Sequence, residues 1–168
     1  MKQIFKQFKL VFFVFFISVM GCTAQQERPN ILFVLCDDLG YNDVGFNGST
    51  DIITPELDKL ANDGVTFTSA YVAHPFCGPS RASILTGRYP HEMGVAFNLH
   101  SNSSMNDADN MGIPTDETYM SKVLQDAGYH TSAFGKWHLG SAPKFHPNTR
   151  GFDNYYGFLG GGHNYFPQ

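Results

Sequence analysis

One short run of the sequence combines a nucleophile, a helix start and a basic side chain. Residues 77–81 read CGPSR. Pro79 suits the first turn of a helix, where its missing N–H would have no intrahelical partner, and Gly87 can end that helix. Cys77 is therefore expected at a helix N-terminus, where free N–H groups and the helix dipole favour an anion. Arg81, one turn later, can lean back toward the same anion.

Two carboxylates form a second candidate site. Residues 30–36 read NILFVLC, an apolar run too short for a typical helix, which predicts a buried strand of a parallel sheet. Asp37 and Asp38 follow directly. Because ligands of open α/β sheets gather beyond the carboxyl ends of the strands, this pair indicates a binding site. A plain turn is the alternative, since Asp and Gly40 are both turn formers.

A lysine and a histidine follow a further expected strand. Residues 129–134 read YHTSAF and predict a strand, and residues 135–140 continue as GKWHLG. Lys136 and His138 thus leave a strand end, as the two carboxylates do. A parallel sheet would bring all four side chains to one edge. As a bare hexapeptide, the same run could instead be a turn with a solvated lysine.

The elements that must position these groups are predicted from caps and apolar spacing. Thr54 can cap a helix that starts at Pro55 and stops at Gly64. Residues 65–72 alternate apolar and hydroxyl side chains, which predicts a strand that leads into the Cys77 loop.

A later helix is expected after a cap at Thr115 or Asp116 and before Gly128. Its apolar residues recur at helical spacing and are expected to face the core: Met120, Val123, Leu124 and Ala127. Residues 98–110 are rich in Asn, Ser, Asp and Met without periodicity, so a loop is expected there. In an enzyme this loop would lie over or beside the site, and a disordered insertion is the alternative.

Taken in order, these motifs resemble those of the type I sulfatases of the alkaline phosphatase superfamily. CGPSR followed by LTGR at 85–88 is similar to the cysteine signature of that family, and GKWHLG to its second signature. Residues 30–40 resemble its opening segment, and RGFDNYYGF at 150–158 resembles a later one. The resemblance implies an α/β fold with a mostly parallel central sheet and helices on both faces. It covers only the N-terminal portion of such an enzyme, so the fold is expected to be incomplete in this chain.

The resemblance also implies a function. Members of the family hydrolyse sulfate monoesters, and a maturation enzyme oxidises their cysteine to formylglycine (3-oxoalanine), whose hydrated aldehyde is the nucleophile. Carried over, Cys77 is the precursor of that nucleophile and Arg81 holds it. Lys136 binds the sulfate, and His138 stabilises or deprotonates the nucleophile. The expected substrate is a sulfated small molecule or glycan, and His163, which follows three glycines, is a further candidate substrate contact.

A metal site is implied by the same resemblance. Asp37 and Asp38, together with the converted Cys77, would bind a divalent cation. Hard oxygen donors suit calcium or magnesium better than zinc, and calcium is the expected ion. The remaining metal ligands, and the acid that protonates the leaving alcohol, are expected beyond these residues.

The N-terminus has the layout of an export signal. Three lysines within the first nine residues precede an apolar run, residues 10–20, that is too short to span a bilayer comfortably. Residues 1–24 are predicted to be a signal peptide, and residues 25–168 the N-terminal part of a catalytic domain. Alternatively, residues 1–21 are a lipoprotein signal, and a lipid on Cys22 attaches the protein to a membrane. Both readings place the protein in the periplasm, at the cell surface or outside the cell.

The charge of the chain excludes one class of partner. The formal net charge is −4, and removal of the signal with its three lysines takes it to −7. A chain this acidic is a poor candidate for nucleic acid, whose binding depends on Lys and Arg that neutralise phosphates. An anionic substrate would have to be attracted locally, by the metal, Arg81 and Lys136.

Three other functions remain open from the sequence. The same superfamily contains hydrolases of phosphate and phosphonate esters. A non-catalytic envelope lipoprotein could keep the scaffold to bind sulfated glycans. A cysteine hydrolase could use Cys77 with His138. A Cys36–Cys77 disulfide is disfavoured, because it would consume the nucleophile and small disulfide-stapled domains use more cysteines.

Overall fold

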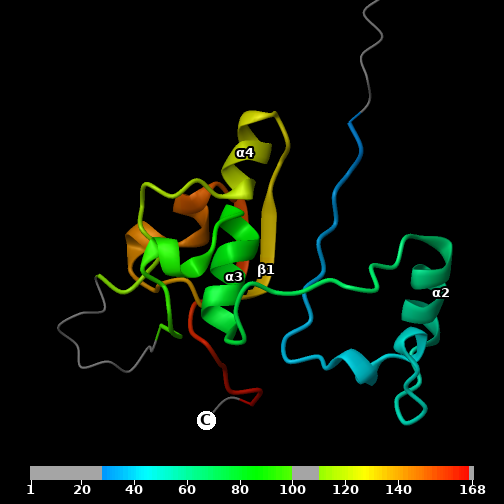
Figure 1. Cartoon of the computed structure of the whole chain (residues 1–168). Helices are drawn as coiled ribbons and strands as arrows, with labels where there is room; N and C mark the ends of the chain where they lie inside the picture. Colours follow the sequence, from blue (N-terminus) through cyan, green and yellow to red (C-terminus); the bar gives the residue numbers. More distant parts are fainter. Residues whose placement is uncertain (1–27, 100–109, 167–168) are drawn as a thin grey trace, which may run out of the picture. The chain divides into compact units, whose positions relative to one another are not determined.

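The computed structural model describes residues 28–99 and 110–166 (Figure 1). The chain divides into two compact units, residues 1–35 and residues 36–168. The predicted signal peptide, the alternative lipoprotein signal and Cys22 lie outside the described residues. Residues 28–35 contain neither helix nor strand and are exposed. Within the described ranges, no helix has the length and apolar character needed to cross a membrane.

The second unit carries the regular structure. In chain order its helices and strands are α2 Pro55–Asp63, α3 Cys77–Thr86, α4 Met120–Asp126, β1 Ser132–Lys136 and β2 Asn154–Phe158. Short 3-10 turns lie before α2, between α3 and α4, and between the two strands.

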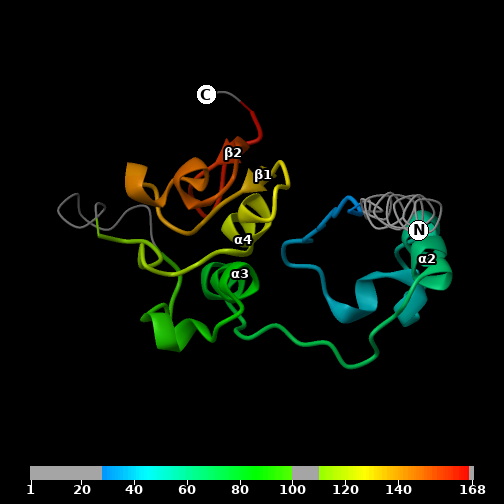
Figure 2. The same ribbon diagram turned by 90° about the horizontal axis from the view of Figure 1, so that it is seen from above.

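The two strands pair in parallel, from Ser132 opposite Asn154 to Lys136 opposite Phe158. Parallel strands need a crossover connection, and here the crossover contains two 3-10 turns. Seen from above, α3 and α4 lie on one side of the strand pair (Figure 2). A parallel pair flanked by helices belongs to the predicted α/β class.

A core of buried side chains includes residues that directly follow β1. Its members are Ala82, Met93, Val95, Ile113, Tyr119, Trp137 and Leu139. The indole N–H of Trp137 donates to the carbonyl of Phe145 at 3.0 Å, and its ring centroid lies 6.0 Å from that of Tyr119. Burial of so large a side chain fixes the backbone on both sides of it. Trp137 therefore anchors its neighbours Lys136 and His138.

Two of the predicted strands do not form. Residues 30–36 and 65–72 are in no strand and are exposed; Leu32 is 88% exposed and Tyr71 90%. An apolar run becomes a buried strand only when neighbouring strands pair with its backbone and other elements cover its faces. Among the described residues, the sheet consists of β1 and β2. Both strand predictions are therefore wrong for this chain.

The helix predictions hold where the signals are local. α2 starts at Pro55 after Thr54 and stops before Gly64, as predicted. α3 ends at Gly87, whose φ of 69° is a left-handed conformation that glycine adopts without strain.

α4 starts later than predicted. It begins at Met120, beyond the predicted caps at 115–116. The guanidinium of Arg150 donates to three carbonyls within residues 114–117, which keeps this segment out of the helix.

The buried face of α4 also differs from the prediction. Within the expected core stripe, Met120 and Leu124 are partly buried, whereas Val123 and Ala127 are exposed. Ser121 is buried instead, and its hydroxyl donates to the carbonyl of Arg150 at 2.6 Å. Helical spacing identified the helix but not the side that packs.

Candidate active site

Cys77 is the first residue of α3, as predicted, and it is partly buried. Its Sγ lies 3.3 Å from Nδ1 of His138. At this helix start, backbone N–H groups without intrahelical partners and the helix dipole favour a negative charge. A thiol and an imidazole at this distance can exchange a proton.

His138 is held in place through its backbone and through one nitrogen of its ring. Its backbone has a left-handed φ of 63°, directly after the anchored Trp137. The Nε2 atom lies 3.1 Å from the carbonyl oxygen of Leu99. Because a carbonyl only accepts, Nε2 carries the proton, and Nδ1 of the neutral ring is left as the acceptor that faces Cys77.

The surroundings of His138 favour this neutral form. Burial lowers the pKa of His138, and the positive charge of Lys136 lowers it further. The ring is therefore neutral at pH 7, with an unprotonated Nδ1 directed at the sulfur. This is the state that a proton acceptor needs.

Lys136, Arg81 and Asp37 form a charged cluster. Lys136 Nζ donates to Asp37 Oδ2 at 2.8 Å, and Arg81 Nη2 lies 3.5 Å from Oδ1 of the same carboxylate. Arg81 Nη1 also donates to the carbonyl of Lys136 at 2.7 Å, which ties α3 to the end of β1. Burial raises the pKa of Asp37, but the hydrogen bond and charge of Lys136, together with Arg81, outweigh burial and lower it. Two cations share one carboxylate, so the cluster carries a net charge of +1, which favours an anion nearby.

One donor of this cluster is unused. Across the residues that the structure describes, Arg81 Nε is buried and has no hydrogen-bond partner. A buried polar group left unsatisfied costs roughly 1–3 kcal/mol. An anionic oxygen would satisfy it. The unused donor is therefore available to a bound oxyanion.

The predicted metal ligands are not gathered into a metal site. In the described ranges, no group of three or more His, Cys, Asp or Glu side chains could hold an ion. Both oxygens of Asp37 face cations, and Asp38 is exposed with a left-handed φ of 59°. The carboxylates have the donor type that a hard cation prefers, but their number does not complete a site. A shared cation on Asp37, Asp38 and Cys77 stays a prediction.

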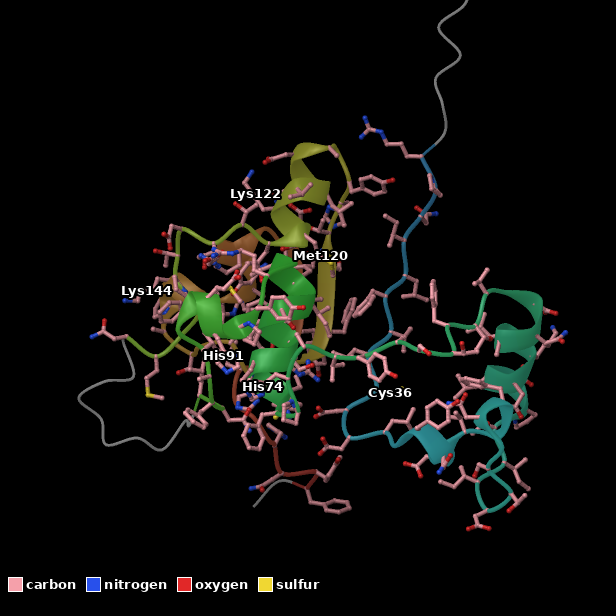
Figure 3. The ribbon with its side chains drawn as sticks, viewed as in Figure 1. Cys36, His74, His91, Met120, Lys122 and Lys144 are labelled. Atoms are coloured by element: carbon pink, nitrogen blue, oxygen red, sulfur yellow. The ribbon has the colours of Figure 1, made fainter. Side chains whose placement is uncertain are left out.

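Three further histidines, His163, His74 and His91, and the second cysteine lie outside the Cys77 and His138 pair. His163 is exposed, and its ring lies against that of Phe158 with centroids 5.4 Å apart. Figure 3 shows His74 and His91 near each other beside α3, and Cys36 on the extended segment that precedes α2. Cys36 and Cys77 are both free. The predicted substrate contact by His163 stays a prediction.

The structure adds one residue that the sequence did not single out. Asn98 Oδ1 accepts a hydrogen bond from the Gly78 N–H at 2.9 Å and lies 3.5 Å from Cys77 Sγ. The only signal for it was its place at the start of a loop that was expected beside the site. Nothing in the composition of that loop distinguishes this asparagine from its neighbours.

Comparisons with known proteins agree with one another. A family model described as Sulfatase matches residues 29–166. N-acetylgalactosamine-6-sulfatase of Mus musculus is 42% identical over 145 residues, which cover 84% of this chain and 28% of that protein. The crystal structure of Ps i-CgsB is 61% identical, with a TM-score of 0.78, and covers 83% of this chain and 30% of its own.

A second structure of the same protein, Ps i-CgsB in complex with k-i-k-neocarrahexaose, is 62% identical with a TM-score of 0.72. It covers 77% of this chain, which spans 28% of that one. The chain therefore spans less than a third of the length of the proteins that it matches.

Proposed function

Since the chain belongs to the sulfatase family, with its α/β alkaline phosphatase-like fold, we propose that the full-length protein hydrolyses sulfate monoesters. The observation that carries this proposal is the pair of Cys77 and His138, with Sγ and Nδ1 3.3 Å apart at the start of α3. The charged cluster supports it, because Lys136 and Arg81 supply the positive field that a sulfate needs in a chain of formal net charge −4.

We propose for each side chain a role that is compatible with its contacts. Conversion of Cys77 to formylglycine by a maturation enzyme would supply a hydrated aldehyde as the nucleophile. His138 Nδ1 accepts the proton from the group at position 77 and is kept free to do so by the proton on Nε2. Arg81 offers its unused Nε–H to an oxygen of the bound group. Lys136 Nζ, which is bonded to Asp37 here, binds the sulfate.

A divalent cation is the further component of this proposal. Asp37 and Asp38 would hold it through hard carboxylate oxygens, which favour calcium, with magnesium as the second choice. When bound, such an ion acts as a Lewis acid that draws negative charge from the sulfate oxygens. The ligands that complete it would come from outside the described residues.

The proposed substrate is a sulfated carbohydrate. One relative is named N-acetylgalactosamine-6-sulfatase, and the structure of one neighbour at 62% identity is a complex with k-i-k-neocarrahexaose. Oligosaccharides of that kind are the first to test. We also propose export, on the basis of the lysines and apolar run at the N-terminus, with a lipid on Cys22 as the alternative to a soluble mature protein.

The test uses full-length protein made together with a maturation enzyme. Hydrolysis of an aryl sulfate is compared with that of the matched aryl phosphate. We expect the sulfate to be preferred, the Cys77→Ala variant to be inactive and the Cys36→Ala variant to stay active. Preference for the phosphate would favour a phosphate ester hydrolase, and no turnover of any sulfate would refute the proposal.

The thiol and imidazole pair also supports a second candidate, a cysteine hydrolase. Its geometry is the same 3.3 Å contact, with Cys77 unmodified. Iodoacetamide would label and inactivate such an enzyme. A hydrazide would instead label the aldehyde that the sulfatase proposal requires.

A further inference from the structure

A two-residue segment touches both members of the reacting pair. Asn98 contacts Cys77 and the backbone of Gly78 through Oδ1. The next residue, Leu99, contacts His138 through its carbonyl oxygen. The two contacts reach helix α3 and the end of β1 from one place in the loop that follows α3.

The amide oxygen of Asn98 receives two donors. The Gly78 N–H is one of the first N–H groups of α3, which have no intrahelical partner. Because that N–H can only donate, the atom of Asn98 that faces it is the oxygen, and the same oxygen lies 3.5 Å from Cys77 Sγ. Asn98 therefore holds the backbone just after Cys77 and also faces its reacting atom.

The ring of His138 is confined on its Nε2 side. Leu99 fixes the proton on Nε2, as the 3.1 Å contact requires. Gly161 lies against the same atom: a Cβ at this position would be 2.7 Å from Nε2 and 2.8 Å from Cε1. No side chain fits between Gly161 and the ring. At Gly162, by contrast, a Cβ would meet nothing within 4 Å.

We infer that Asn98 and Leu99 form a positioning segment for the reaction, in which Asn98 orients the side chain at position 77 and Leu99 sets the tautomer of His138. With Gly161 behind the ring, Nδ1 stays directed at the nucleophile. Neither residue reacts. The catalytic consequence rests on the proposed sulfate hydrolysis, whereas the tautomer can be observed without it.

The first experiment measures kinetics in the full-length, converted enzyme. Asn98→Leu keeps the size and removes the acceptor, and we expect kcat to fall about 10- to 100-fold with KM changed less than about threefold. Asn98→Asp keeps an oxygen acceptor for the Gly78 N–H and should recover most of that loss. Asn110→Leu, at the other end of the loop, is the control and should behave as the wild type.

The second experiment reads the tautomer directly by NMR of protein labelled with ¹⁵N in histidine. The signals of His138 are identified by their absence in His138→Gln. We expect the Nε2–H form in the wild type and in Gly162→Ala. In Gly161→Ala, the added methyl group should displace the ring and change this signal.

Several outcomes would overturn the inference. A wild-type His138 with the proton on Nδ1 would remove the role of Leu99. Equal kinetics in Asn98→Leu and wild type, or no recovery in Asn98→Asp, would remove the role of Asn98. If the full-length protein hydrolyses no sulfate, the proposed function fails, but the tautomer and the contrast between Gly161→Ala and Gly162→Ala still decide how His138 is held.

Discussion

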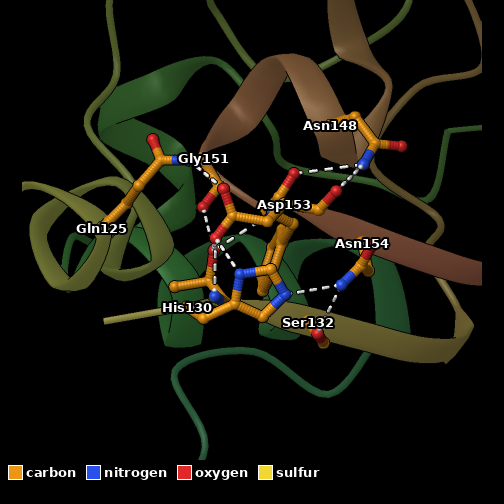
Figure 4. Close-up of polar contacts among 9 residues, drawn as sticks. Gln125, His130, Ser132, Asn148, Gly151, Asp153 and Asn154 are labelled. Atoms are coloured by element: carbon orange, nitrogen blue, oxygen red, sulfur yellow. Dashed lines mark hydrogen bonds and ion pairs between the residues drawn. The ribbon is translucent and has the colours of Figure 1, made fainter. Parts of the chain in front are cut away.

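Two polar networks of this chain contain similar residues but differ in what they do. One is the charged cluster of Arg81, Lys136 and Asp37 beside the Cys77 and His138 pair. The other lies at the N-terminal ends of β1 and β2, where Asp153 meets Gln125 and His130 (Figure 4). Both belong to motifs that resemble the same family, so the motifs alone do not distinguish them.

In the second network, the charged side chains are hydrogen-bonded to backbone groups. The guanidinium of Arg150, 7% exposed, donates to three carbonyls and lies 4.3 Å from the centroid of the Tyr119 ring. Asp153 accepts from the N–H of Thr131 at 2.7 Å. These bonds tie the two strands and the segment before α4 together. They stabilise the fold.

The charged cluster, by contrast, has an unpaired donor and a partly exposed carboxylate. Arg81 Nε has no partner in the described part of the chain, and the Asp37 side chain is 39% exposed. Its charges converge where Nδ1 of His138 faces Cys77. Unpaired donors and convergent charges, not motif residues as such, therefore indicate where chemistry occurs.

The largest effect is expected for Arg81. Arg81→Gln in the full-length enzyme removes the charge and most donors, and kcat/KM should fall about 100- to 1,000-fold while the protein stays folded. Kinetics with an aryl sulfate and a thermal unfolding curve measure the two quantities. If the variant loses stability as strongly as activity, the role of Arg81 is structural, like that of Arg150.

Arg150 should show the reverse pattern. Arg150→Gln leaves three part-buried carbonyls short of donors, so the free energy of unfolding should fall by about 3 kcal/mol. Denaturant titration gives this value, and activity per folded molecule should be unchanged. A large loss of kcat in folded protein would show that Arg150 acts in catalysis, which would contradict the contrast between the two networks.

Asp153 should give a smaller, pH-dependent effect. The backbone N–H of Thr131, followed by Gln125, lowers the pKa of Asp153. A carboxyl whose pKa is lower in the folded state adds stability above its unfolded pKa of about 4, and this stability is lost as pH falls through the folded value. Asp153→Asn should therefore lower the melting temperature at neutral pH and match the wild type in acid. A difference that is constant with pH would contradict this.

His163 should give the smallest effect. It is exposed, and its ring lies against that of Phe158. His163→Ala should change KM for a sulfated oligosaccharide less than about threefold. A larger rise in KM, with kcat retained, would show that His163 binds substrate as the sequence predicts.

The sequence predicted the helix ends and the proximity of some candidate residues better than the strands. Pro79 and Gly87 mark the ends of α3 through local rules that do not depend on the rest of the chain. Lys136 was predicted to follow a strand over residues 129–134 and is the last residue of β1, where it meets Asp37 across 99 residues of sequence. Residues 30–36 and 65–72 are different, because an apolar run becomes a strand only through partners that the run itself does not specify.

Other tertiary contacts were not predicted. Asn98 and Leu99 meet Cys77 and His138 across 21 and 39 residues, and nothing in their composition indicates it. The start of α4 was misplaced for the same reason, since distant Arg150 binds the carbonyls before it. Local signals place elements, and tertiary packing decides what they touch.

The most direct test of the central claim is peptide mass spectrometry of full-length protein that turns over an aryl sulfate. We expect the peptide that contains residue 77 to carry the aldehyde, while the peptide that contains Cys36 keeps its thiol. Cys36 serves as the internal reference, because both cysteines are free in the structure. Active protein in which Cys77 is found only as a thiol would contradict the assignment of the nucleophile.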